Sequence, residues 1–194
     1  LAERILNNEL PSLLIIDTLS KPDSFDAKAR KHGFLPVMRW PGMIFPMKSS
    51  FDPELSPELE IRKVEDQSTL RDWIDIVNAT LFIKSGIHRD AFLPLLKQQH
   101  IGLYVGYSED QPASTVAIFT RSQTSGLYLG GTLPRFRGKG FMGSMIKHSL
   151  SEAAAQGCKW SILEASGKSY SIYKRIGFQD IVNFDIFWKP KITK

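Results

Sequence analysis

The stretch LPRFRGKGFMG, residues 133–143, places three glycines and three cations directly before a segment of helical apolar periodicity. The first backbone N–H groups of a helix lack partners within the helix, and the helix dipole favours an anion beside them. Glycine lets the backbone approach such an anion closely. The stretch therefore predicts a phosphate-binding turn, with the backbone N–H groups from about Arg137 to Met142 as donors.

Two phosphate ligands fit this turn. Gly138, Gly140 and Gly143 have the G-x-G-x-x-G spacing of dinucleotide-binding proteins, and Glu164 ends a predicted strand where a ribose-binding acid belongs. The same residues also read R-G-x-G, which suits the pyrophosphate of coenzyme A. Residues 134–137 separate the preceding strand from the first glycine, and too little chain follows Glu164 for further β-α units. Both features count against a dinucleotide ligand. An NAD(P)-binding oxidoreductase therefore ranks third among the functions considered, after the two that are described below.

Hydrophobic periodicity predicts the order β-α-α-β-β-β-α-β-α-β-β from residue 59 onward. Asp66 is the expected N-cap of the first helix, and Gly157 is expected to end the helix after the glycine turn. The order predicts a mixed α/β (α+β) sheet, mostly antiparallel, with one β-α-β crossover. The expected strands are 59–65, 101–108, 112–122, 127–133, 159–165 and one or two after 178, and the expected helices are 66–82, 89–99, 141–156 and 168–176.

Composition limits the function classes. The 194 residues carry a net charge of +5 from dispersed cations without the usual basic modules, so we expect no nucleic-acid partner. The single Cys158 excludes internal disulfides and Cys-based zinc sites, and the histidines have no metal-ligand spacing, so no metal is expected. The longest apolar run has about four residues (13–16), and no secretory signal is visible. We expect a cytoplasmic protein without a membrane partner.

Two motifs occur together in the second half of the chain. A proline, two residues and then R-G-x-G lie at 134–140, and Y-x-x-x-G-F lies at 173–178. In this order and at this distance, residues 59–190 resemble the GNAT N-acetyltransferase superfamily. Met142 stands where the family usually has glycine or alanine, and Ser166 stands where many relatives carry asparagine. The resemblance implies the GNAT acyl-CoA N-acyltransferase fold, whose β-α-β crossover binds the cofactor acetyl-CoA.

The resemblance also implies direct transfer of an acetyl group from acetyl-CoA to a primary amine in a ternary complex. Tyr173 would be the general acid for the leaving thiolate, with Tyr170 as a weaker stand-in; tyrosine, with a pKa of about 10, suits this role. The base is open, because residues 116–133 hold no carboxylate. Glu164 is the nearest candidate, His88 the second, and a water chain the default. The implied cofactor-binding residues are Gly130, Gly131, Thr132, Arg137, Gly138, Lys139, Gly140, Phe141, Met142 and Ser166.

The predicted organisation is an N-terminal extension at 1–48, a polar linker at 49–58 and a GNAT domain at 59–194. Residues 28–46 can be laid beside 171–190, with Gly33-Phe34 on Gly177-Phe178. The extension is thus either the remnant of a GNAT-like half or a chance likeness, and it resembles N-terminal extensions of some GNAT proteins. We hypothesise that it shapes or covers the amine site.

The acceptor stays open at this stage, because a small-molecule amine and a peptide amine are both compatible with the sequence. A homodimer is also compatible. The main alternative to an enzyme is a regulatory module that binds acyl-CoA without turnover. This alternative stays open because residues 116–133 hold no carboxylate that could act as the base.

Overall fold

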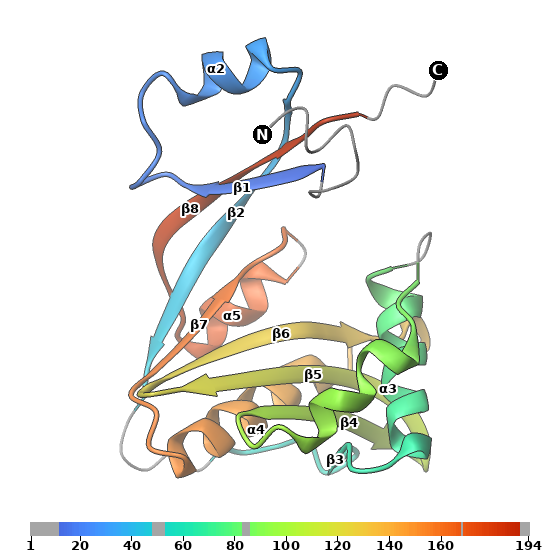
Figure 1. Ribbon diagram of the computed structural model, residues 1–194. Helices are drawn as coiled ribbons and strands as arrows, with labels where there is room; N and C mark the ends of the chain where they lie inside the picture. Colours follow the sequence, from blue (N-terminus) through green and yellow to red (C-terminus); the bar gives the residue numbers. More distant parts are fainter. Residues whose placement is uncertain (1–11, 48–52, 83–85, 168, 191–194) are drawn as a thin grey trace. The chain divides into compact units, whose positions relative to one another are not determined.

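The computed structural model describes residues 12–47, 53–82, 86–167 and 169–190 (Figure 1). The chain forms two compact units that do not follow chain order. The terminal unit contains 1–43, 164–170 and 179–194, and the central unit contains 44–163 and 171–178. The final strand thus belongs with the N-terminal segment. Part of the expected linker, residues 49–52, lies outside the described residues, and the predicted domain boundaries stay a prediction.

The central unit is built on strands in the order β7-β6-β5-β4-β3. Neighbouring strands pair antiparallel from β3 to β6, whereas β6 and β7 are parallel. The predicted mixed, mostly antiparallel sheet is therefore confirmed, and it is not the parallel sheet that a dinucleotide-binding fold requires. The strands are β3 Glu60–Lys63, β4 Ile101–Ser108, β5 Gln111–Arg121, β6 Thr124–Thr132 and β7 Trp160–Glu164, whose last residue belongs to the terminal unit.

Helices cover both faces of this sheet. Helix α3 (Gln67–Thr80) packs on the face that carries Leu103 and Val105, and its N-cap Asp66 accepts a hydrogen bond from the Thr69 N–H at 2.8 Å, as predicted. Helix α4 (Phe141–Ala155) covers the opposite face and forms the predicted crossover between β6 and β7. The same helix ends before Gly157, whose φ of 78° fits the expected glycine stop.

Shorter helical segments connect these elements. The helix predicted at 89–99 is instead two 3₁₀ segments, η1 (Arg89–Ala91) and η2 (Leu93–Lys97). Pro94 explains the difference, because proline cannot donate the hydrogen bond that a continuing helix needs. A third 3₁₀ turn, η3 (Pro134–Phe136), leads into the glycine turn, and α5 (Tyr170–Ile176) precedes the last strand.

The terminal unit combines both ends of the chain. Its strands lie in the order β1-β8-β2, with β1 Leu13–Asp17, β2 Leu35–Pro46 and β8 Gln179–Trp188; β2 runs on into the central unit. Strands β1 and β8 are antiparallel, with Leu13 opposite Trp188. Helix α2 (Phe25–Lys31) covers one face, where Ala29, Phe34 and Phe187 form a small core.

The two segments that could be aligned in the sequence share a local structure. Helix α2 ends with Gly33 at φ 79°, and the N–H of Phe34 donates to the carbonyl of Ala29. Helix α5 ends with Gly177 at φ 114°, and the N–H of Phe178 donates to the carbonyl of Tyr173. Both are Schellman-type helix ends followed by a strand. Ala29 therefore occupies the position in the first segment that Tyr173 has in the second.

Candidate active site

The glycine turn leaves a row of backbone donors at the start of α4. Gly138 and Gly140 have φ of 83° and 79°, in the left-handed region that glycine favours. Among the described residues, no backbone N–H from Gly138 to Gly143 donates to a backbone carbonyl. A Cβ placed on any of the three glycines would meet no atom within 4 Å. The turn is thus open and donor-rich, which suits a diphosphate.

The cations of the turn have partners of their own. The Nε of Arg137 donates to the carbonyl of Thr132 at 3.1 Å, and its backbone N–H donates to that of Pro134, so this amide is not a free donor. The Nζ of Lys139 lies 3.5 Å from the carboxylate of Glu58. Because both side chains are exposed, their positive charge remains available to an anion at the turn.

Strand β6 is distorted just before the turn. Thr115 pairs with Gly131 and Ala117 with Tyr128, so Leu129 and Gly130 stand opposite a single residue of β5. Leu129 has a φ of 52°, as expected at a β-bulge. A Cβ on Gly131 would overlap the hydroxyl of Thr80, so this glycine permits close packing of α3 on the strand. At the bulge the carbonyls of Leu129 and Gly131 accept hydrogen bonds from the hydroxyls of Thr115 and Ser114, and the resemblance expects pantetheine beside this part of β6.

Tyr173 lies on α5 in the central unit, as does the glycine turn. Its ring is half-buried and packs edge-on against Phe178 at 5.8 Å between centroids, and Phe178 packs in turn on Phe45. Tyr170 differs from it, because its hydroxyl donates to the carboxylate of Asp180 at 2.7 Å. That hydrogen bond raises the pKa of Tyr170, which makes it a poorer proton donor.

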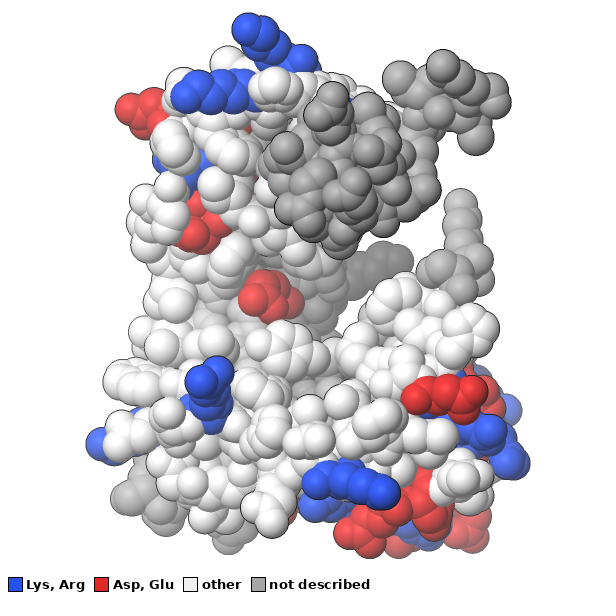
Figure 2. All heavy atoms as spheres, viewed as in Figure 1, with Lys and Arg blue, Asp and Glu red and all other residues white. Residues whose placement is uncertain are grey.

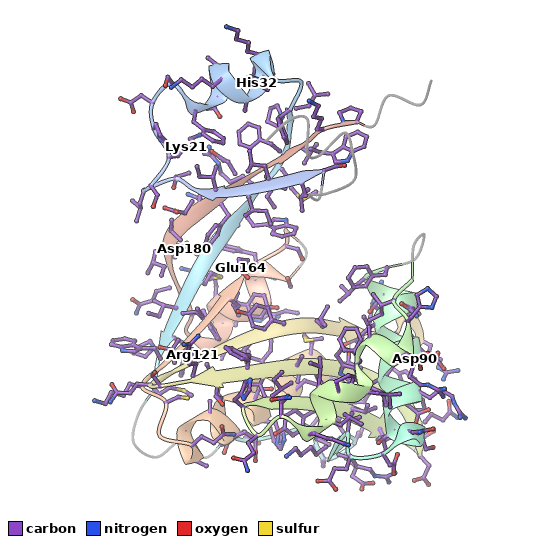
Figure 3. The ribbon with its side chains drawn as sticks, viewed as in Figure 1. Lys21, His32, Asp90, Arg121, Glu164 and Asp180 are labelled. Carbon is purple, nitrogen blue, oxygen red and sulfur yellow. The ribbon has the colours of Figure 1, made fainter. Side chains whose placement is uncertain are left out.

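Two other predicted residues belong to the terminal unit. Glu164 is exposed at the end of β7 (Figure 3), and the burial of β7 alternates so that Trp160, Ile162 and Glu164 share the exposed side. The Ser166 hydroxyl lies 3.1 Å from that of Ser169, and its carbonyl accepts the first N–H of α5. The proposed roles of Glu164 and Ser166 stay predictions.

The segment after α3 is fixed by a residue that the sequence analysis did not select. The side-chain amide of Asn78 accepts from the N–H of Ile87 at 2.6 Å and donates to its carbonyl at 3.2 Å. The exposed His88 follows directly and stands at the N-cap position of η1, where its side chain makes no capping hydrogen bond. Asn78 thus positions the backbone beside the second candidate base. The sequence carried no signal for this role, because α3 (QSTLRDWIDIVNAT) contains many other polar residues.

Two further histidines and the cysteine serve in packing, whereas His32 is exposed after α2. His100 packs on Phe119 and His148 on Tyr104, and burial lowers the pKa of His148. Cys158 is buried, and burial raises the pKa of its thiol. In the described part of the chain, no group of histidine, cysteine, aspartate or glutamate side chains could hold a metal ion. Nor does any described helix have the length and apolarity to span a bilayer.

The bulged antiparallel sheet, the β-α-β crossover and the glycine turn together form the acyl-CoA N-acyltransferase fold that the sequence led us to expect. A family model described as the acetyltransferase (GNAT) domain matches residues 60–181, which is more than half of the chain. The chain therefore belongs to the GNAT acetyltransferase family. No match was found among curated proteins.

Solved structures share the fold at low sequence identity. A GCN5-related N-acetyltransferase from Kribbella flavida has a TM-score of 0.73 and 16% identity over 92% of this chain and 68% of its own. One from Sphaerobacter thermophilus has a TM-score of 0.74 and 13% identity over 94% of this chain but only 62% of its own. A predicted acetyltransferase from Clostridium acetobutylicum, solved with acetyl-CoA, has a TM-score of 0.53 and 22% identity over 63% of this chain and 91% of its own.

Proposed function

We propose that the protein transfers an acetyl group from acetyl-CoA to a primary amine, directly and within a ternary complex. The observation that carries the proposal is the open turn before α4, where the N–H groups from Gly138 to Gly143 have no backbone acceptor among the described residues. Family membership supports acetyl-CoA as the donor, and the Clostridium acetobutylicum neighbour was solved with that cofactor.

The residues of the turn fit a coenzyme A pyrophosphate. The amides from Gly138 to Met142 would bind its oxygens, and the charges of Arg137 and Lys139 would add to the attraction. The main chain of β6 at 130–132 would bind the pantetheine amides as a neighbouring strand does. Acetyl-CoA supplies the activated thioester, and the protein supplies its position beside the amine.

Two protons must move during the transfer. The amine nitrogen forms a bond to the acetyl carbon, the C–S bond breaks, and the sulfur takes a proton. We assign that donation to the Tyr173 hydroxyl. The proton lost by the amine passes to water by default, with Glu164 and His88 as the candidate bases.

The test compares two tyrosine variants on the same helix. Removing a general acid slows the chemical step about 10²–10⁴-fold. We therefore expect Tyr173→Phe to lower kcat in that range without changing the Kd for acetyl-CoA. Tyr170→Phe should change kcat less than about threefold, because its hydroxyl is bonded to Asp180. Equal effects of the two variants on kcat would contradict the role of Tyr173 as the general acid. Acetyl-CoA binding without turnover of any amine would favour the non-catalytic regulatory module.

A further inference from the structure

Two adjacent hydroxyl side chains of β5 are fully buried beside the β6 bulge. Ser114 and Thr115 are each 0% exposed, within the otherwise apolar sequence PASTVAIF. Polar side chains are buried less often than apolar ones, and they have hydrogen-bond partners when they are. The partners of both hydroxyls are main-chain carbonyls of β6, and these carbonyls lie at or next to the bulge. Both residues can therefore shape this part of β6.

The Thr115 hydroxyl contacts the residue of the bulge whose backbone is strained. Its Oγ1 donates to the carbonyl of Leu129 at 3.2 Å. Leu129 has a φ of 52°, a left-handed conformation that is unfavourable for a residue with a Cβ. Such a conformation persists only where the surrounding structure fixes it. The hydrogen bond from Thr115 is one of the contacts that fix Leu129.

Ser114 approaches β6 from the opposite face of the sheet, because adjacent residues of a strand point to opposite faces. Its Oγ lies 2.9 Å from the carbonyl oxygen of Gly131 and 2.8 Å from the Oγ1 of Thr132. A hydroxyl has one proton, which Ser114 donates to Gly131, so Thr132 is the donor in the second hydrogen bond. The two hydroxyls thus form a chain that ends on the Gly131 carbonyl, and hydrogen bonds in such a chain strengthen one another.

A third side chain donates to the β5 residue that lies opposite the bulge. This residue is Val116, between the paired residues Thr115 and Ala117. The indole N–H of Trp73 on α3 donates to the carbonyl of Val116 at 3.3 Å, and Trp73 is fully buried. Buried main-chain groups require such partners. Side chains from β5 and α3 therefore stabilise the bulge by donating to carbonyls of both strands.

The main chain that follows the bulge points to the edge of β6 where pantetheine would bind. The N–H of Leu133 donates to the carbonyl of Ala113 at 2.9 Å. Residues of an antiparallel strand alternately face the partner strand and face away from it, so the main chain of Thr132 points away from β5. Its carbonyl accepts from the Nε of Arg137 at 3.1 Å. In the described part of the chain, β7 pairs with β6 only along 124–126, so β7 does not cover this edge at Thr132.

Charge distinguishes this edge from the glycine turn. The β6 sequence TSGLYLGGT contains no charged residue, whereas the turn carries Arg135, Arg137 and Lys139. Figure 2 shows charged side chains gathered over α3 and its neighbours, and a mainly uncharged surface over β6. Pantetheine is neutral and carries amides, so its affinity for this edge depends on hydrogen bonds and therefore on their geometry. The position of the β6 main chain thus matters more for pantetheine than for the pyrophosphate.

We propose that Ser114 and Thr115 are positioning residues for the pantetheine part of acetyl-CoA. This inference rests on the proposed acetyl transfer. Their hydroxyls hold the carbonyls of Gly131 and Leu129 from opposite faces of the sheet, so that the edge of β6 has its binding geometry before the cofactor arrives. Without one of these hydroxyls the segment has to be ordered during binding, and that cost weakens binding of the pantetheine part.

The test compares two ligands by calorimetric titration of the full chain. One is acetyl-CoA, and the other is 3′-phospho-ADP, which has the pyrophosphate of coenzyme A but no pantetheine. Thr115→Val and Ser114→Ala should each raise the Kd for acetyl-CoA about three- to tenfold, as loss of one hydrogen bond implies, and leave the Kd for 3′-phospho-ADP unchanged. Thr115→Ser, which keeps a hydroxyl, should bind acetyl-CoA as the wild type does.

The matched control is Ser125→Ala. Ser125 is also 0% exposed, and its Oγ donates to the main-chain carbonyl of Trp160 at 3.4 Å, but it lies at the other end of β6. This variant should change the Kd of neither ligand. An equal rise in the Kd values of both ligands in Thr115→Val would overturn the inference, because the hydroxyl would then support the fold as a whole. So would an equal loss of acetyl-CoA affinity in Ser125→Ala.

The outcomes separate this inference from the proposed function. If the wild type acetylates amines but Thr115→Val and Ser114→Ala bind acetyl-CoA as it does, the positioning role alone is contradicted. If the variants show the expected Kd values but the wild type acetylates no amine, the positioning role is supported and acetyl transfer is contradicted. A wild type that does not bind acetyl-CoA would contradict both.

Discussion

Two glycines of one helix allow backbone strain to be separated from ligand binding. Gly140 precedes the first turn of α4 at φ 79°, and Gly157 follows the last turn at φ 78°. A Cβ on either residue would have no atom within 4 Å. The substitutions Gly140→Ala and Gly157→Ala therefore impose the same backbone change at opposite ends of α4, with no steric overlap in the protein.

The effect on stability should be the same for both variants. A left-handed conformation is unfavourable for alanine by roughly 1–2 kcal/mol relative to glycine, so each should lower the free energy of unfolding by about 1 kcal/mol. The effect on acetyl-CoA should differ. A methyl group at Gly140 occupies space in front of the free amides, and loss of one hydrogen bond to a charged phosphate is worth about 1.5–3 kcal/mol. We expect the Kd to rise about tenfold or more.

The assay pairs urea unfolding with calorimetric titration by acetyl-CoA, with NADH as a parallel ligand. Gly157→Ala should bind acetyl-CoA as the wild type does, and NADH should bind to none of the proteins. Equal acetyl-CoA affinity in the two variants would refute the assignment of the turn as the pyrophosphate site. If Gly140→Ala alone lost much more stability, the turn would contribute to folding in a way that the absence of steric overlap at Gly140 does not predict.

Three further results are expected. Arg39 and Lys21 donate hydrogen bonds to the buried carboxylate of Asp185 and lower the pKa of that carboxylate. The ionised Asp185 therefore stabilises the fold above a pH of about 4, and this stabilisation is lost as the pH falls toward the folded-state pKa. Asp185→Asn should lower the free energy of unfolding in urea by about 1–3 kcal/mol at pH 7, and should make that free energy depend less on pH in the acid range. A Cβ on Gly131 overlaps the Thr80 hydroxyl, so Gly131→Ala should lower stability by about 1–3 kcal/mol, with partial recovery when Thr80→Ala is added, measured by the same unfolding. Asp110 has a φ of 58° in the exposed turn between β4 and β5, so Asp110→Gly should stabilise the protein by about 1 kcal/mol, seen as a higher urea midpoint.

Local patterns predicted the elements of the central unit. The Asp66 cap, the hairpin of β4 and β5 and the glycine stop of α4 each depend on residues within a few positions of one another. The crossover followed from the order of strand, turn, helix and strand. Sequence periodicity carries such short-range information directly.

Long-range contacts were less accessible. The pairing of β1 with β8 joins the two ends of the chain, and no local signal marks it. The placement of Tyr128 over Gly126 depends on a side-chain rotamer, and the packing of Thr80 on Gly131 depends on how a helix docks. The sequence placed Gly130 and Gly131 in a strand, but only the structure shows that Gly130 belongs to the bulge and Gly131 to the helix contact.

The pairing of β1 with β8 also sets an order of events during synthesis. Asp17 is opposite Phe184, so 167 residues separate the two partners. In the described part of the chain β1 pairs with β8 alone. At about 5–20 residues per second, the ribosome needs roughly 10–30 s to deliver the second strand after the first. Strand β1 therefore waits for its partner until β8 has been synthesised, whereas the hairpins of the central unit can form earlier.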